Sequence, residues 1–272
     1  MIKEKYPILI SNPRNGSTWV QSYIRAFYNL KGVCLPKHGI LAKDSLKYSA
    51  KNPLTTEEYF GGQYSQAIRN IKISVIENLE KQNLVLCHKV HTLYFLEDQY
   101  LWNWFKEFYK DYHIIILRRR NIWKTYISYL FHQTMDNFII NKGTISVDLN
   151  LHPWHGNSYS STHEDIIKST IQTNNIKFTY NYLIWKRFIK GVRFLQDDVI
   201  RHFSTKPKFW LEDLTNEKLA KIFQVEVQDE IRPLKRLNYM SYYDIKELKI
   251  IKDNFEERFE NEFRFYGYEY KY

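Results

Sequence analysis

The start of the chain has the pattern of a strand, a tight turn and a helix, and this order constrains the fold more than any other feature. Pro7–Ser11 is a short apolar, β-branched run that stops at an Asn-Pro pair, as buried parallel strands often do. Apolar residues then recur at helical spacing over Ser17–Leu30. A strand that passes through the turn Asn12–Gly16 into a helix is typical of the first unit of a nucleotide-binding α/β fold.

The remaining periodic segments continue this alternation. Helices are predicted over Ser65–Lys81, Leu96–Tyr109, Trp123–His132, Phe178–Val192, Thr215–Phe223 and Tyr242–Phe263, and strands over Leu84–His91, His113–Leu117 and Pro207–Leu211. We therefore predict a single domain over residues 1–272, with a P-loop-like three-layer α/β/α architecture and a central, mainly parallel sheet. Residues 136–163 show no clear period, so we predict an acceptor-site loop or lid there.

Composition excludes several classes of protein. Hydrophobic residues make up 44% of the chain and charged residues 26%, which permits a sizeable core and excludes a disordered chain. The net charge of +10 favours an anionic partner: nucleic acid, anionic lipid or a phosphorylated small molecule. No apolar run is long enough for a membrane span or a signal peptide. Cys34 and Cys87 have no metal-binding spacing, so we expect two reduced thiols in a cytoplasmic protein, with one disulfide as the alternative.

The first turn carries residues suited to holding an anion. A helix N-terminus offers free N–H groups and the positive end of the helix dipole. Gly16 lets the backbone approach a phosphate closely, Ser17 and Thr18 add hydroxyl donors, and Arg14 adds a planar positive charge. Ser17 stands where a Walker loop has its lysine, so the turn predicts a phosphate loop of another kind. The simpler alternative is a capped helix preceded by a turn.

Three successive arginines follow the third predicted strand. Their side chains alternate in direction on an extended chain, and Arg120, at the turn into the next helix, is the best placed to contact a ligand. Open α/β sheets bind ligands at the carboxyl ends of their strands. Ser128 lies two helical turns further on, so it can share a phosphate with Arg120 only if the strand end folds back beside the helix. A solvated basic patch is the alternative.

Lys89 and His91 end the second predicted strand and point to the same face of it. His91 is suited to act as a general base, because an imidazole titrates near neutral pH. Lys89 is suited to neutralise charge on a transferring group. The alternative is a strand-end histidine that is hydrogen-bonded to a loop.

Four segments, in this order along the chain, together resemble the sulfotransferases that use 3′-phosphoadenosine 5′-phosphosulfate. Pro13–Trp19 is similar to the family's PKxGTTW loop, and Lys89–His91 to its Lys-x-His. Arg120–Ser128 is similar to the family's 3′-phosphate segment, which runs from an Arg to a Ser eight residues later, and Phe209–Leu214 to its YEDL segment. The resemblance covers residues 7–131 well and 178–225 loosely.

The resemblance implies a role for each matched residue. The residues that would bind the nucleotide donor are Arg14, Asn15, Gly16, Ser17, Thr18, Trp19, Arg120 and Ser128. Among them, Trp19 would stack on the adenine, and Arg120 with Ser128 would hold the 3′-phosphate. The catalytic residues would be His91 as general base, Arg14 at the leaving phosphate and Lys89 near the sulfuryl group. The implied reaction is an in-line transfer to a hydroxyl or amine, with adenosine 3′,5′-bisphosphate as product and no metal.

Three departures from the family pattern indicate a divergent member. Arg14 replaces the family's catalytic lysine, Ile122 stands where the family usually has proline, and the C-terminal RKGxxGDW-like loop of the cytosolic animal enzymes is absent. Lys235 and Arg236 are candidates to complete the 3′-phosphate side in place of that loop. The chain is thus more similar to the bacterial and carbohydrate-directed branches.

The acceptor site is expected within residues 136–163. Trp154, His152 and His155 would suit a sugar ring or an aromatic alcohol, or they simply pack the loop. His155 and His163 are alternative general bases should His91 be structural. The partners expected are therefore a nucleotide sulfate donor and a hydroxyl-bearing small molecule or glycan.

Three other functions stay open at this point. A P-loop-like nucleotide or small-molecule kinase would need a magnesium site, and the missing Walker lysine speaks against it. A basic nucleic-acid-binding module would use the arginine run and surface aromatic residues, but no recognised binding motif is present, so no nucleic acid partner is expected. An inactive family member that only binds nucleotide is the third.

Overall fold

The computed structural model describes residues 6–31, 89–96, 99–141, 161–227 and 239–269. Its strands form one sheet of four parallel strands in the order β2-β1-β3-β4. The strands are β1 (Pro7–Ser11), β2 (Lys89–His91), β3 (His113–Arg118) and β4 (Lys208–Trp210). β1 is paired on both sides, with Leu9 opposite Lys89 on β2 and opposite Ile115 on β3. The predicted central parallel sheet is confirmed.

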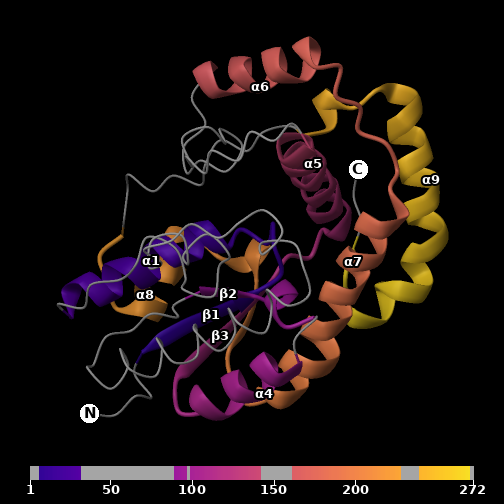
Figure 1. The fold of residues 1–272 in the computed structure, drawn as a ribbon. Coiled ribbons are helices and arrows are strands. Elements are labelled where there is room, and N and C mark those ends of the chain that lie inside the picture. Colours follow the sequence, from indigo (N-terminus) through magenta and orange to yellow (C-terminus); the bar gives the residue numbers. More distant parts are fainter. Residues whose placement is uncertain (1–5, 32–88, 97–98, 142–160, 228–238, 270–272) are drawn as a thin grey trace, which may run out of the picture.

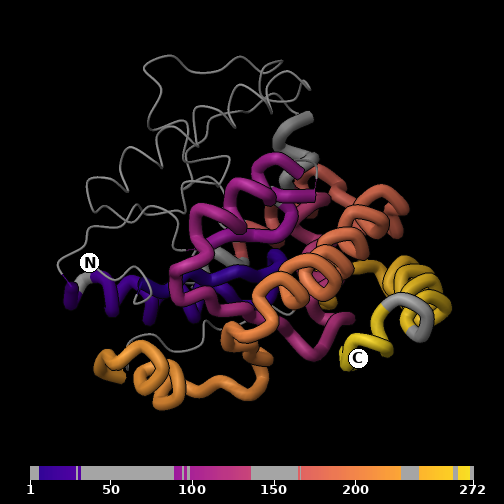
Figure 2. Tube along the Cα trace, turned by 90° about the horizontal axis from the view of Figure 1, so that it is seen from below, coloured from indigo at the N-terminus to yellow at the C-terminus, as the bar shows by residue number. Residues whose placement is uncertain are grey.

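Helices surround this sheet. They are α1 (Ser17–Leu30), α4 (Gln99–Phe108), α5 (Ile122–Asn141), α6 (Ser161–Thr173), α7 (Tyr182–Arg193), α8 (Asn216–Phe223) and α9 (Ile245–Glu262). A π-helical segment, Phe194–Ile200, continues α7 directly, and the two run as one rod across the sheet beside α4 (Figure 2). Within the described ranges, no helix combines the length and the apolar character that crossing a membrane requires.

The two faces of the sheet are covered by different helices, because successive strand residues point to opposite sides. Leu9 and Leu117 pack with residues of α1 and α8. Ile10 and Ile116 pack on the other face with residues of α4 and of the π-helical segment. Figure 1 shows α1 and α8 on one side of the sheet and α4 on the other. The predicted three-layer α/β/α architecture is confirmed.

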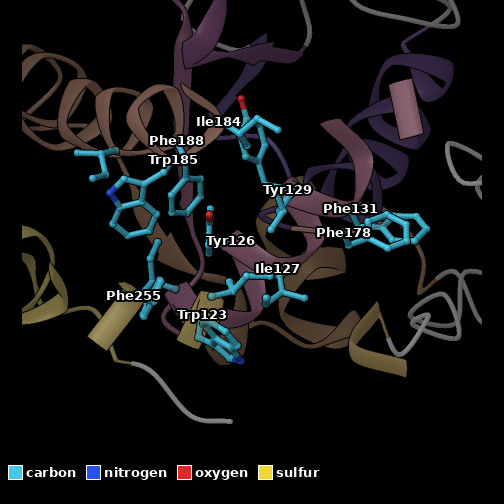
Figure 3. Packing of buried hydrophobic residues seen from close by; sticks show 14 of the residues in the cluster. Trp123, Tyr126, Ile127, Tyr129, Phe131, Phe178, Ile184, Trp185, Phe188 and Phe255 are labelled. Carbon is cyan, nitrogen blue, oxygen red and sulfur yellow. The ribbon is translucent and has the colours of Figure 1, made fainter. Parts of the chain in front are cut away.

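A third, largely aromatic cluster joins α5, α7 and α9 beside the sheet (Figures 1 and 3). Tyr126 on α5 meets Trp185 on α7 edge to face, with ring centres 4.8 Å apart. Trp123 meets Phe255 on α9 in the same way at 5.1 Å. Such pairs add stability beyond the area they bury. The cluster fixes α5 firmly, and α5 carries Ser128 into the candidate site.

Several predicted boundaries need correction. Both ends of the loop predicted over residues 136–163 are helical, because α5 continues to Asn141 and α6 begins at Ser161, and residues 142–160 between them lie outside the described residues. No glycine or proline interrupts the chain between Ser128 and Gly143, so nothing in the sequence ends the helix earlier. The helix predicted from residue 178 begins only at Tyr182, because the Asn181 side chain accepts from two N–H groups of its first turn. The helix predicted over 65–81 and the first half of the strand predicted over 84–91 lie outside the described residues.

Candidate functional site

The candidate site lies at the carboxyl edge of the sheet, beside β1. β1 pairs with β2 on one side and with β3 on the other, so the order of the strands in the sheet reverses at β1. Open α/β sheets bind ligands outside the strand ends at such a reversal. The loop after β1, the end of β2 and the segment after β3 all reach this point. His91 approaches Ser11, and the Arg119 guanidinium donates to the Arg14 carbonyl at 3.3 Å.

The loop between β1 and α1 is tightly folded. Arg14 and Gly16 both adopt the left-handed backbone conformation, with φ of 66° and 76°. The Asn15 side chain is buried and donates to the carbonyl of Leu117 on β3 at 3.3 Å. The Asn15 side chain thus ties the loop to the sheet, and its predicted role in binding the donor stays a prediction. The loop leads directly into the N-terminus of α1 at Ser17.

The Arg14 side chain is held by groups from two distant parts of the chain. Its Nε donates to Ser128 Oγ on α5 at 2.9 Å. Its Nη2 donates to the Tyr239 hydroxyl at 2.8 Å. Ser128 is itself buried. The guanidinium therefore sits at the sheet edge in one defined orientation.

Lys89 and His91 lie on one face of β2, as predicted, while Val90 between them packs on the opposite face of the sheet. Nδ1 of His91 lies 3.4 Å from both the Oγ and the carbonyl oxygen of Ser11. Burial, and then the charge of Lys89, lowers the pKa of His91 to about 3, against a raising effect of the Ser11 backbone bond. His91 is thus a neutral imidazole at neutral pH, which is the form a general base needs.

The lysine has a shifted pKa as well. Burial, followed by the charges of Arg14 and then Arg25, lowers the pKa of Lys89 to about 8. These electrostatic effects mean that Arg14, Lys89 and His91 lie within reach of one another's charge. His91 pairs with Ser11 at the end of β1, and the loop that carries Arg14 follows directly, so the three predicted catalytic residues lie at the same edge of the sheet.

The three arginines after β3 have three different environments. The Arg118 guanidinium stacks on Trp210 of β4, with Cζ 3.8 Å from the ring centre. Burial is the main cause of the lowered pKa of Arg118. Arg119 donates to the Arg14 carbonyl. Arg120 donates through Nη2 to both carboxylate oxygens of Asp213, at 2.9 and 3.1 Å. Of the three arginines, Arg119 is thus the one that contacts the loop between β1 and α1.

The Glu212 carboxylate accepts hydrogen bonds from the backbone at the start of α5. The two oxygens of Glu212 accept from the N–H groups of Arg120, at 2.8 Å, and Asn121, at 3.2 Å. The Asn121 side chain caps α5 by accepting from the N–H of Lys124. Glu212 and Asp213 belong to the segment that resembles YEDL, so in this protein the acidic pair of that segment binds the residues expected to hold a 3′-phosphate.

Arg120 and Ser128 were predicted to share one phosphate, and the structure gives each a different partner. Arg120 contacts Asp213, whereas Ser128 contacts Arg14. Trp19, predicted to stack on adenine, is half-buried and donates through Nε1 to the Asn216 side chain at 3.1 Å. Their roles in nucleotide binding stay predictions.

Sequence reasoning missed Tyr239 and His132. Tyr239 begins a 3-10 turn, Tyr239–Tyr242, and its hydroxyl lies 3.3 Å from Nε2 of the buried His132 on α5. Of the two, only His132 could have been found from the sequence, because it follows Ser128 by one helical turn and so lies on the same side of the predicted helix. Other predicted residues lie outside the described residues: His152, Trp154, His155, Lys235, Arg236 and both cysteines. His163 falls within α6 rather than in a loop.

Comparison of the chain with protein-family models, with curated proteins and with solved structures found no match. Among the described residues, no three His, Cys, Asp or Glu side chains gather where they could hold a metal ion.

Proposed function

We propose that this chain is a cytoplasmic sulfotransferase that moves a sulfuryl group from 3′-phosphoadenosine 5′-phosphosulfate to a hydroxyl or amine acceptor, with carbohydrates as one candidate class. The observation that carries the proposal is the grouping of Arg14, Lys89 and His91 beside the phosphate loop. Two cations and a neutral imidazole at a strand edge suit the transfer of an anionic group to a protonated acceptor.

The charges around the loop support an anionic donor. Neither Arg14 nor Lys89 is paired with a carboxylate among the described residues. Burial lowers the pKa of Lys89 most, and the positive charges of Arg14 and Arg25 lower it further through repulsion. A phosphosulfate placed between these cations would relieve that repulsion, and the N-terminus of α1 would add backbone donors on the same side.

In the proposed reaction the acceptor oxygen forms a bond to sulfur while the bond from sulfur to the 5′-phosphate oxygen breaks. The proton of the acceptor hydroxyl passes to Nε2 of His91, provided that Nδ1 carries the hydrogen and donates to Ser11. Arg14 stabilises the negative charge that develops on the departing phosphate, and Lys89 stabilises the sulfuryl oxygens. The contribution of the Arg14 guanidinium is electrostatic.

The proton affinity of His91 should depend on the donor. Two of the effects that lower its pKa are the positive charges of Lys89 and Arg14. A bound dianion would offset both charges and would therefore raise the pKa of His91. The base would thus be strongest when the sulfate donor is in place.

The first test is calorimetric titration with adenosine 3′,5′-bisphosphate, beside AMP and beside ATP without magnesium. Tight binding that requires the 3′-phosphate is the expected result. Equal or absent binding of the three nucleotides, with ATP preferred once magnesium is added, would overturn the proposal in favour of a kinase.

Variants then separate binding from chemistry. His91→Ala should abolish turnover on an acceptor found by screening, while affinity for adenosine 3′,5′-bisphosphate is kept. His113, at the amino end of β3, is the matched control, and His113→Ala should keep both. Full activity of His91→Ala would show that His91 is not the base.

A further inference from the structure

Among the described residues, the Arg14 guanidinium forms its hydrogen bonds through one edge only. Nε–H and the nearer hydrogen of Nη2 form one side of the planar group, and these two donors bind Ser128 and Tyr239. Nη1 and the second hydrogen of Nη2 form the other side. No described residue accepts from Nη1. That free edge has the two-donor geometry that matches a phosphate or sulfate oxygen pair.

Tyr239 is positioned to hold this orientation rather than only to fill space. Its oxygen accepts from Arg14 at 2.8 Å, so its own hydrogen is available to His132 Nε2, 3.3 Å away. The Arg14 Cζ also lies 5.8 Å from the centre of the Tyr239 ring, close enough for a cation–π contribution. The Tyr239 ring in turn packs on Phe131, with centres 5.0 Å apart.

We infer that Tyr239, oriented by His132, is a positioning residue that turns the free edge of Arg14 toward the 5′-phosphate of the donor. The inference rests on the proposed function for the identity of that anion. It also accounts for arginine at this position: a lysine ammonium has no second edge, so it could not bind Ser128 and Tyr239 and still offer a planar pair of donors.

The experiment compares Tyr239→Phe with Tyr242→Phe. Tyr242 lies in the same 3-10 turn and packs on the same Phe131, with ring centres 5.3 Å apart, but its hydroxyl makes no hydrogen bond to Arg14. Both variants keep the aromatic ring. They therefore share any packing effect and differ in the contact with Arg14.

Each protein is titrated with adenosine 3′,5′-bisphosphate and with adenosine 3′-monophosphate, which lacks the group that Arg14 would bind. Tyr239→Phe should weaken binding of the bisphosphate roughly three- to tenfold, because one hydrogen bond is lost. It should leave binding of the monophosphate unchanged. Tyr242→Phe should change neither. Equal losses for both nucleotides, or no loss for either, would overturn the inference, because a purely structural role cannot select the 5′-phosphate.

A second measurement separates this inference from the proposed function. Should the wild-type protein not bind the bisphosphate, the proposed function fails, and the positioning role is decided by nuclear magnetic resonance of the unliganded protein. The Arg14 guanidinium signals, assigned by their loss in Arg14→Lys, should exchange with solvent at least threefold faster in Tyr239→Phe than in Tyr242→Phe. Equal exchange in the two variants would refute the role of Tyr239.

Discussion

Replacement of Gly16 by alanine tests whether the loop between β1 and α1 is fixed by its contact with the segment after β4. Gly16 has a φ of 76°, and a Cβ at this position would lie 2.7 Å from both Leu211 methyl carbons. Carbon atoms pack at about 3.5–4.0 Å, so Leu211, which is 4% exposed and cannot swing into solvent, must move. Two costs therefore add at this position: the left-handed backbone and the clash.

The expected cost is about 3 kcal/mol. The left-handed conformation costs a non-glycine residue about 1 kcal/mol, and overpacking of a buried side chain costs about 2 kcal/mol. A chain of 272 residues unfolds with an entropy of about 0.57 kcal/mol/K, at about 2.1 cal/mol/K per residue. The melting temperature of Gly16→Ala should therefore fall by about 5 °C.

Gly267 provides the matched control. Its φ of 75° is nearly the same, but a Cβ there would meet only the Trp210 ring, at an ordinary 3.9 Å. Gly267→Ala should carry the backbone cost alone, about 1 kcal/mol and so a fall of about 2 °C. Thermal unfolding followed by circular dichroism measures both. Equal shifts in the two variants would refute the claim that Leu211 restricts position 16.

The other predictions concern an ion pair, a buried lysine and two buried tyrosines. Asp213→Asn should tighten binding of adenosine 3′,5′-bisphosphate but not of AMP in calorimetry, because it releases Arg120; since Asp213 is half exposed, stability should change by less than about 1 kcal/mol. The folded protein holds the Lys89 proton less tightly than the unfolded chain, so stability should rise with pH between about 8 and 10.5, and Lys89→Met should flatten that rise in urea unfolding. Tyr126→Phe should raise stability by about 1 kcal/mol, because no described residue accepts from its buried hydroxyl. Tyr243→Phe should lower stability by a similar amount, through loss of a hydrogen bond to a backbone carbonyl on α5, and a result of the same sign for the two tyrosines would contradict the reasoning.

The sequence predicted the sheet well because its signals are local. Pro7–Ser11 and His113–Leu117 are short apolar runs that end at turn or charged residues, and both are central strands with the expected bounds to within one residue. The turn between β1 and α1 could be predicted for the same reason, since strand, turn and helix are adjacent in the chain. Helix ends were predicted less well, because α5 continues through residues that neither break nor cap a helix.

The partners of the charged side chains could not be predicted, because they depend on contacts between distant segments. Arg14 and Tyr239 are 225 residues apart in the chain, and Arg120 and Asp213 are 93 apart. No periodicity links such positions. The resemblance identified Arg120 and Ser128 as one pair, yet the fold pairs each with another residue, because Ser128 lies two turns along α5 and faces the first loop.

The balance of charge along the carboxyl edge of the sheet differs between its two sides, and this difference bears on how an anion would enter. Beside β3 and β4, the Arg120 side chain and the backbone N–H groups next to it are already bound by Asp213 and Glu212. Beside β1 and β2, Arg14 and Lys89 have no carboxylate partner among the described residues. We therefore expect an anion to be attracted first to the loop after β1, where it would displace no carboxylate of the described residues. In the proposed function, a 3′-phosphate would have to compete with Asp213 for Arg120, so its contribution to affinity would be reduced by the ion pair that it replaces.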